Sequence, residues 1–195
     1  MKQVLIKNGI AISKDVPVPA LGSDEVLVQV HASCISMGTE FSSIKGSSIP
    51  LWKRAASQPE KLIRTAEIVA NEGFQRAIDV VKEKAGAEYP TGYSASGIVV
   101  DVGSNVTEFV VGDRVACAGG GYAYHAEFIR TPVNLCVSLS NSLSFNSGCT
   151  VTLGAIALQG VRRANPTLGE TFAVIGLGVL GQITVQILRA NGCRV

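Results

Sequence analysis

The sharpest chemical signal in the sequence is a group of three glycines near its C-terminal end. Gly176, Gly178 and Gly181 follow an apolar run, residues 172–175, and precede a segment with helical spacing, residues 182–190. Between a strand and a helix, this spacing is typical of a loop that binds the diphosphate of a dinucleotide. The first glycine permits the tight turn, the second lets the backbone approach the phosphates, and the third lets the helix lie close to the strand. The alternative interpretation is a glycine-rich turn that binds no ligand.

Backbone amides rather than side chains would bind the ligand of such a loop. The N-terminus of a helix offers free N–H groups and partial positive charge to an anion. We therefore expect the cofactor-binding residues to be Gly176, Leu177, Gly178, Val179, Leu180 and Gly181. Residues 172–175 show no polar alternation, which predicts a parallel strand buried on both faces.

The residue that distinguishes NAD from NADP is expected about 20 residues beyond such a loop, at the tip of the second strand. The sequence ends at Val195, soon after that strand would begin. We therefore expect this chain to be the front part of a longer enzyme and to be inactive alone. The choice between NAD and NADP stays open.

Short apolar segments separated by Pro, Gly and Asn fill most of the remaining sequence. Their spacing predicts strands at residues 4–6, 11–12, 26–32, 97–103, 113–118, 124–129 and 135–137. This pattern favours a small β-barrel or sandwich. A helical hairpin interrupts it at about residues 51–86, where a capping box, Ser57 and Glu60, precedes apolar residues at helical spacing. Residues 151–161 predict a further helix.

The composition excludes several classes of protein. With 47% hydrophobic and 16% charged residues, the chain is neither a disordered protein nor a coiled coil. A net charge of +2 gives no reason to expect a nucleic acid or a membrane as partner. The N-terminus has only a three-residue apolar run, residues 4–6, so no signal peptide is expected and a cytoplasmic location follows. The five cysteines contain no C-x-x-C pair and are expected to be reduced.

Several segments occur in an order that resembles the medium-chain dehydrogenase/reductase family, which includes zinc alcohol dehydrogenases and zinc-free quinone reductases. They are residues 26–33, 97–103, 112–115, 169–171 and 176–181. The resemblance implies an α/β and β protein with a GroES-like β-barrel catalytic domain, residues 1–148, that carries the helical hairpin as an insert. Residues 149–195 would form a linker helix and the truncated start of a Rossmann domain.

The family resemblance also implies NAD or NADP as cofactor, a small-molecule substrate and a homodimer. The hairpin looks like the insert of bi-domain oxidoreductases, in which a second oxidoreductase domain follows.

The zinc ligands of the family are not found at their expected positions. Ser36 or Met37 stands where the first ligand would be, and Tyr93 stands where a ligand histidine would be. Neither Ser nor Met offers the thiolate, imidazole or carboxylate that zinc requires. Cys149 lies near the position of the third ligand, and one ligand does not hold a metal. We predict that no zinc is bound; a displaced site with Cys34, Cys149 and Glu40 is the alternative.

Without zinc, other groups must polarise a carbonyl and move a proton. Thr39 matches the hydroxyl of the family's proton relay in one alignment, and the Tyr93 phenol could donate to a developing oxyanion. Thr39, Glu40 and Tyr93 are therefore the candidate catalytic residues, whereas a helix cap and a packed aromatic are the structural alternatives. The expected function is hydride transfer to or from a carbonyl, alcohol or activated alkene. The alternative is a non-catalytic assembly module derived from a dehydrogenase barrel.

Overall fold

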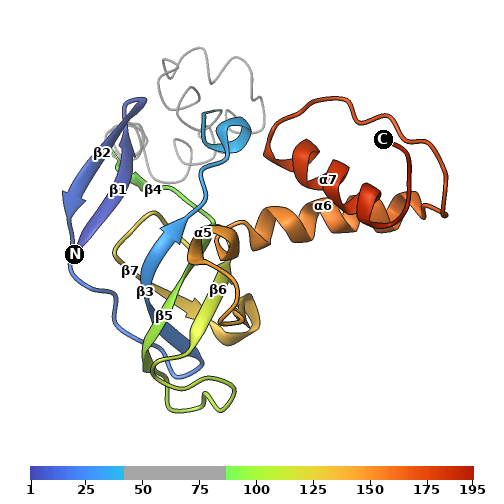
Figure 1. Cartoon of the computed structure of the whole chain (residues 1–195). Coiled ribbons are helices and arrows are strands. Elements are labelled where there is room, and N and C mark those ends of the chain that lie inside the picture. The colour runs from blue at the N-terminus through green and yellow to red at the C-terminus, as the bar shows by residue number, and fades with distance from the viewer. Residues whose placement is uncertain (42–86) are drawn as a thin grey trace, which may run out of the picture. The chain divides into compact units, whose positions relative to one another are not determined.

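The computed structural model describes residues 1–41 and 87–195, so the helical insert expected at about 51–86 lies outside the described residues. The chain divides into two compact units. One unit combines Met1–Gln3, Asp15–Ser36 and Gly92–Val195, and the other combines Val4–Lys14 with Met37–Thr91. Figure 1 labels most of the helices and strands described below.

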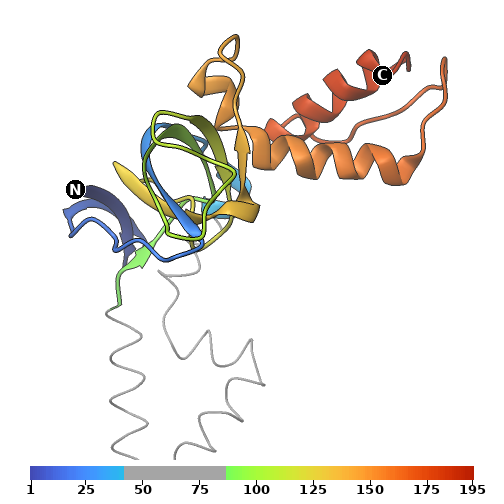
Figure 2. The same ribbon diagram turned by 90° about the horizontal axis from the view of Figure 1, so that it is seen from below.

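A five-stranded antiparallel sheet forms the larger part of the first unit. Its order is β7-β3-β5-β6-β8, and its strands curl around a common axis in Figure 2. The strands are β3 (Glu25–Ser33), β5 (Ser94–Val102), β6 (Arg114–Ala118), β7 (Phe128–Pro132) and β8 (Cys136–Ser138). The pairing of β3 with β5 shifts register twice, at Leu27/Val28 and at Val30/Ala32. Such irregularities bend and twist a strand, which helps a short sheet to curl.

The hydrophobic core of this sheet consists mainly of β-branched side chains. Val26, Val28, Val99, Val115 and Ile129 come from four strands and are almost completely buried. Their branched side chains pack well on a pleated surface, which accounts for the strand pattern of the sequence.

The second unit contains a hairpin and one short strand. Strands β1 (Lys2–Lys7) and β2 (Ile10–Asp15) are joined by Asn8 and Gly9, which both have positive φ, 49° and 81°. Two such residues match the twist of the strands they connect. Strand β4 (Tyr89–Pro90) pairs with β1, so the sheet order is β2-β1-β4.

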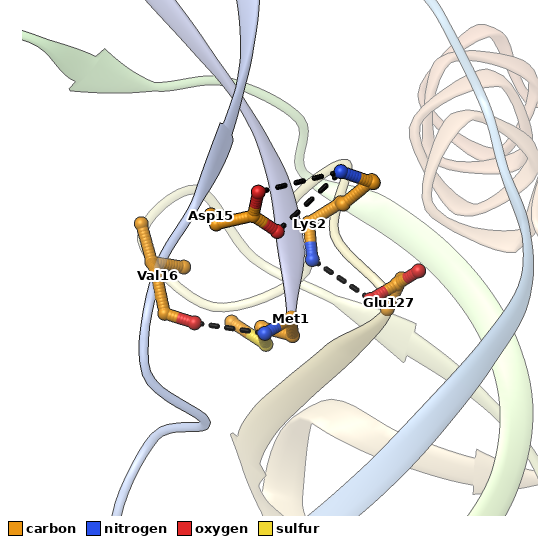
Figure 3. A network of polar contacts seen from close by, with 5 residues as sticks. All are labelled: Met1, Lys2, Asp15, Val16 and Glu127. Carbon is orange, nitrogen blue, oxygen red and sulfur yellow. Dashed lines mark hydrogen bonds and ion pairs between the residues drawn. The ribbon is translucent and has the colours of Figure 1, made fainter.

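Polar contacts fix the N-terminal residues within the first unit (Figure 3). The Met1 amino group donates to the Val16 carbonyl at 2.9 Å, and the Lys2 amide donates to the Glu127 carboxylate at 2.8 Å. The Lys2 side chain also pairs with Asp15 at 3.4 Å. The ion pair between Lys2 and Asp15 is exposed and contributes little stability, so the two hydrogen bonds of the backbone nitrogens are the main contacts of these N-terminal residues.

Three helices follow the sheet in sequence: α5 (Phe145–Gly148), α6 (Val151–Ala164) and α7 (Val179–Ala190); a short 3-10 helix, η1 (Val133–Leu135), precedes β8. Two hydroxyls of β5 hold α5 and the residue after it. Ser94 donates to the Cys149 carbonyl and Ser96 to the Phe145 carbonyl, each at 2.6 Å. Both serines are buried, and these bonds satisfy hydroxyls that would otherwise be costly to bury.

Two strand predictions need correction. The strand expected at 172–175 is reduced to one parallel bridge between Thr171 and Arg194, because a ladder needs a longer paired neighbour. The strand expected at 124–129 lies instead at 128–132, since the backbone at Ala123 and Tyr124 bonds within a turn, to the carbonyls of Gly119 and Tyr122.

Among residues 1–41 and 87–195, none of the helices combines the length and the apolar character that crossing a bilayer requires.

Candidate functional site

The glycine loop connects the bridge at Thr171 with helix α7. Gly176 has φ +96°, a conformation that a residue with a Cβ rarely adopts. Gly178 is the N-cap of α7, with extended backbone at φ −68° and ψ −177°. The chain therefore turns sharply at Gly176 and enters the helix two residues later.

Gly181 is required by close approach rather than by its dihedral angles. A Cβ on Gly181 would collide with the carbonyl oxygen of Gly176, so no larger residue fits without moving the loop. A Cβ on Gly178, by contrast, would meet no atom within 4 Å. The space beside Gly178 is open to a ligand, while Gly176 and Gly181 set the shape of the turn.

The first turn of α7 has backbone N–H groups that no side chain caps. The Gln182 amide donates to the Gly178 carbonyl at 2.9 Å, which closes the first helical turn. The Gln182 side chain also donates to the Leu177 carbonyl at 3.0 Å and so holds the loop against the helix. No acidic residue lies in this first turn, so nothing there repels an anion. These features fit the diphosphate of a dinucleotide.

Helix α7 and the segment before it pack against α6. Leu188, Cys193 and Val161 form a small buried cluster, on which Phe172 and Val174 also pack. Ile175, in contrast, is 100% exposed. The segment 172–175 is thus covered on one face, and the expected burial on both faces is not observed.

Thr39 and Glu40 lie in the second unit, in the helical residues 37–41. Thr39 is exposed, whereas Glu40 is only 8% exposed. The Glu40 carboxylate accepts a hydrogen bond from Thr91 Oγ1 at 3.1 Å. Glu40 therefore links this helical turn to the residues just after β4.

Tyr93 lies in the first unit, immediately before β5, and is half-buried. Its backbone carbonyl accepts hydrogen bonds from the Gly119 amide at 2.9 Å and from Thr152 Oγ1 at 3.4 Å. These contacts tie the residue to the glycine-rich turn after β6 and to the start of α6. The catalytic roles of Thr39, Glu40 and Tyr93 stay predictions.

The described part of the chain holds no group of three or more His, Cys, Asp or Glu side chains arranged to bind a metal. Cys149 donates its thiol to the Asn146 carbonyl at 3.2 Å. Burial and the nearby Cys34 raise the pKa of the Cys149 thiol above its ordinary value.

Two polar pairs in the first unit were not anticipated from the sequence. His125 Nδ1 and Ser33 Oγ lie 2.8 Å apart, although 92 positions separate them. Cys117 and Cys136 lie opposite each other on β6 and β8. A signal for the cysteine pair was present, because Cys117 and Cys136 each fall in a predicted strand, 113–118 and 135–137, on opposite sides of a glycine-rich turn. No comparable signal marks the other pair.

No protein-family model matches the chain. Curated relatives include sorbitol dehydrogenase of Bos taurus, which is 27% identical over 203 residues, an alignment covering 90% of this chain and 48% of the relative. (R,R)-butanediol dehydrogenase of Bacillus subtilis is 30% identical over 125 residues, which cover 52% of this chain and 36% of that protein. The chain thus spans at most about half the length of these relatives.

Solved structures resemble the chain over nearly its whole length. An alcohol dehydrogenase superfamily protein from Novosphingobium aromaticivorans aligns with a TM-score of 0.66 and 25% identity, over 100% of this chain and 52% of its own. The Escherichia coli quinone oxidoreductase complexed with NADPH aligns with a TM-score of 0.69 and 17% identity, over 99% and 51% of the two chains. These likenesses confirm the expected fold, a GroES-like barrel followed by the beginning of a Rossmann domain.

Proposed function

We propose that the chain belongs to the medium-chain dehydrogenase/reductase family and that it is the catalytic barrel and the beginning of the cofactor domain of an NAD(P)-dependent oxidoreductase. The barrel would comprise residues 1–148, and residues 149–195 would supply the linker helix and the first β-α unit. The full-length protein would transfer a hydride to or from a carbonyl, alcohol or activated alkene of a small molecule. This chain alone would be inactive.

The single observation that carries the proposal is the geometry of the glycine loop. Gly176 adopts a left-handed conformation, Gly181 has no room for a side chain, and the first turn of α7 has no side-chain cap. A turn that merely connected two elements would not need all three features.

In the proposed mechanism, the nicotinamide ring supplies or accepts the hydride when NAD or NADP is bound. The backbone N–H groups of Gly176, Leu177, Gly178, Val179, Leu180 and Gly181 bind and orient the diphosphate. The phenol of Tyr93 donates a hydrogen bond to the substrate oxygen as negative charge develops on it. Thr39 passes a proton through its hydroxyl, and Glu40 positions the helical turn through Thr91.

We further propose that the reaction is independent of zinc, because Ser36 or Met37 stands where the family's zinc enzymes place their first ligand and Tyr93 stands where they place a histidine. A cytoplasmic location and a homodimer are additional proposals, the second of which follows from the family resemblance.

The fluorescence of reduced nicotinamide tests the proposal. Titration of NADH and NADPH with the full-length protein is expected to give a saturable change in fluorescence for at least one of them. A protein that changes the fluorescence of neither dinucleotide would instead be the non-catalytic assembly module that the missing metal ligands also favour.

A further inference from the structure

Cys117 and Cys136 face each other across two paired strands. They are register partners in the antiparallel pairing of β6 and β8, and their sulfur atoms lie 3.8 Å apart. Residues directly opposite in such a pair have Cα atoms about 4.5–5.5 Å apart, which falls within the range of disulfide bonds. Both thiols are free in this structure. The backbone therefore already has a spacing that a disulfide between these residues requires.

The surroundings of the pair favour ionisation of one thiol. A hydrogen bond from Cys136 and the nearby hydroxyl of Thr131 lower the pKa of Cys117, although burial opposes this. The hydrogen bond with Cys117, burial and the charge on Cys117 raise the pKa of Cys136. Thr131 is completely buried, and its hydroxyl has no hydrogen-bond partner among the described residues. Within the pair, Cys117 therefore ionises more readily than Cys136.

Access from solvent differs between the two thiols. Cys117 is 2% exposed, whereas Cys136 is partly exposed on β8, which is an edge strand of the five-stranded sheet. Cys136, whose side chain packs against the edge of the core, is thus the residue of the pair nearer to solvent.

We propose that Cys117 and Cys136 are an oxidative modification site that takes a low-molecular-weight disulfide of the glutathione type as its oxidant. This proposal does not depend on the proposed dehydrogenase activity. Its outcome would be a covalent link between β6 and the edge strand β8.

The exchange proceeds in two displacements that balance. In the first displacement, the Cys136 sulfur attacks one sulfur of the small disulfide, and the Cys136 proton goes to the small thiolate that leaves. In the second displacement, the Cys117 sulfur attacks the Cys136 sulfur, and the Cys117 proton goes to the second small thiolate that leaves. The two cysteines lose two electrons, and the small disulfide is reduced to two thiols.

The neighbouring cysteines Cys149 and Cys34 provide a comparison of reactivity within the same chain. Cys149 and Cys34 interact electrostatically, but burial raises the pKa of Cys149 and its thiol donates to the Asn146 carbonyl. Cys117 and Cys136 are register partners whose sulfur atoms lie 3.8 Å apart, so the second displacement needs little movement there. The site formed by Cys117 and Cys136 should therefore oxidise first.

Peptide mapping of this chain tests the proposal. The reduced protein is incubated with oxidised glutathione, its remaining thiols are blocked with N-ethylmaleimide, and the digest is examined by mass spectrometry. We expect a peptide pair joined through Cys117 and Cys136, and two fewer blocked thiols than the five of the reduced chain. The link should disappear after treatment with dithiothreitol.

Two variants test whether the disulfide forms specifically between Cys117 and Cys136. Cys193→Ser, which removes a buried cysteine elsewhere, should leave the link intact, whereas Cys117→Ser should leave glutathione attached to Cys136. Three results with the wild-type chain would overturn the proposal without any variant: five blocked thiols, a link between Cys34 and Cys149 in place of the expected one, or glutathione on single cysteines without an internal link.

Discussion

Gly97 and Gly181 are positions at which one added methyl group would collide with a backbone carbonyl oxygen. On Gly97 that oxygen belongs to Gln29 of the neighbouring strand β3, and on Gly181 it belongs to Gly176. Backbone atoms cannot rotate away as side chains do, so both sites require glycine. The first site keeps two strands of the barrel paired, and the second keeps the loop against α7.

Replacement of Gly97 tests this reading of the barrel. Gly97→Ala should lower the free energy of unfolding by about 1–3 kcal/mol, the usual cost of overpacking. Gly160→Ala is the matched control, because Gly160 lies on α6 with open space around it. That change should raise stability by about 0.5–1 kcal/mol, since alanine favours a helix. Urea unfolding followed by circular dichroism measures both, and equal effects of the two changes would contradict the argument.

Thr131 gives a second prediction for a single residue. Thr131→Val removes the hydroxyl that helps to lower the pKa of Cys117, while it keeps the shape of the side chain. Each unit by which that pKa rises should slow the second displacement, in which Cys117 attacks, about threefold near neutral pH, because fewer thiolates outweigh their greater nucleophilicity. In the wild type, the rate should already rise with pH below the ordinary thiol range. Stopped-flow quenching with an alkylating agent measures both rates, and a Thr131→Val rate equal to that of the wild type at every pH would refute this role.

Helix α6 connects the barrel to the glycine loop, and its two faces differ sharply. Leu153 is 1% exposed and faces the protein interior, whereas Ile156 on the same helix is 51% exposed. Ala157 and Val161 continue the buried face, and Val161 also packs with Leu188 of α7. The buried face of α6 therefore contacts α7, the helix that follows the glycine loop.

Matched truncations test the role of α6. Leu153→Ala should cost about 2–5 kcal/mol of unfolding free energy because it leaves a cavity. Ile156→Ala should change it by no more than about 0.5 kcal/mol, as is usual for exposed positions. Thermal unfolding followed by circular dichroism compares the two variants. A similar loss of stability in both would show that Leu153 is not a core residue.

Hydrophobic periodicity predicted the elements that a single stripe or alternation defines. Helix α6 and strand β3 lie where residues 151–161 and 26–32 indicated them. The segment 172–175 was misjudged, because an apolar run does not reveal whether a neighbouring strand pairs with it. The candidate site could be predicted only in part. The spacing of Gly176 and Gly181 predicts their backbone roles, whereas the hydrogen bond between Glu40 and Thr91, 51 residues apart, follows only from the fold.

For the whole molecule, the proposal combines a barrel that binds no zinc with a loop that binds a dinucleotide. Metal analysis addresses the first half of this description. The purified full-length protein should contain far less than one zinc per chain after dialysis against a chelator, since Ser36, Met37 and Tyr93 are poor ligands. Stoichiometric zinc that survives dialysis would favour a displaced site with Cys34, Cys149 and Glu40.

Calorimetric titration of the full-length protein addresses the second half, which is the central claim. NADH or NADPH should give saturable heat with the wild type and with Gly160→Ala. Gly181→Ala, which pushes a methyl group into the Gly176 carbonyl, should weaken binding at least about tenfold, or 1.4 kcal/mol, while circular dichroism shows that the protein stays folded. If neither dinucleotide binds the wild type, or if Gly181→Ala binds as tightly as Gly160→Ala, the loop does not hold a diphosphate.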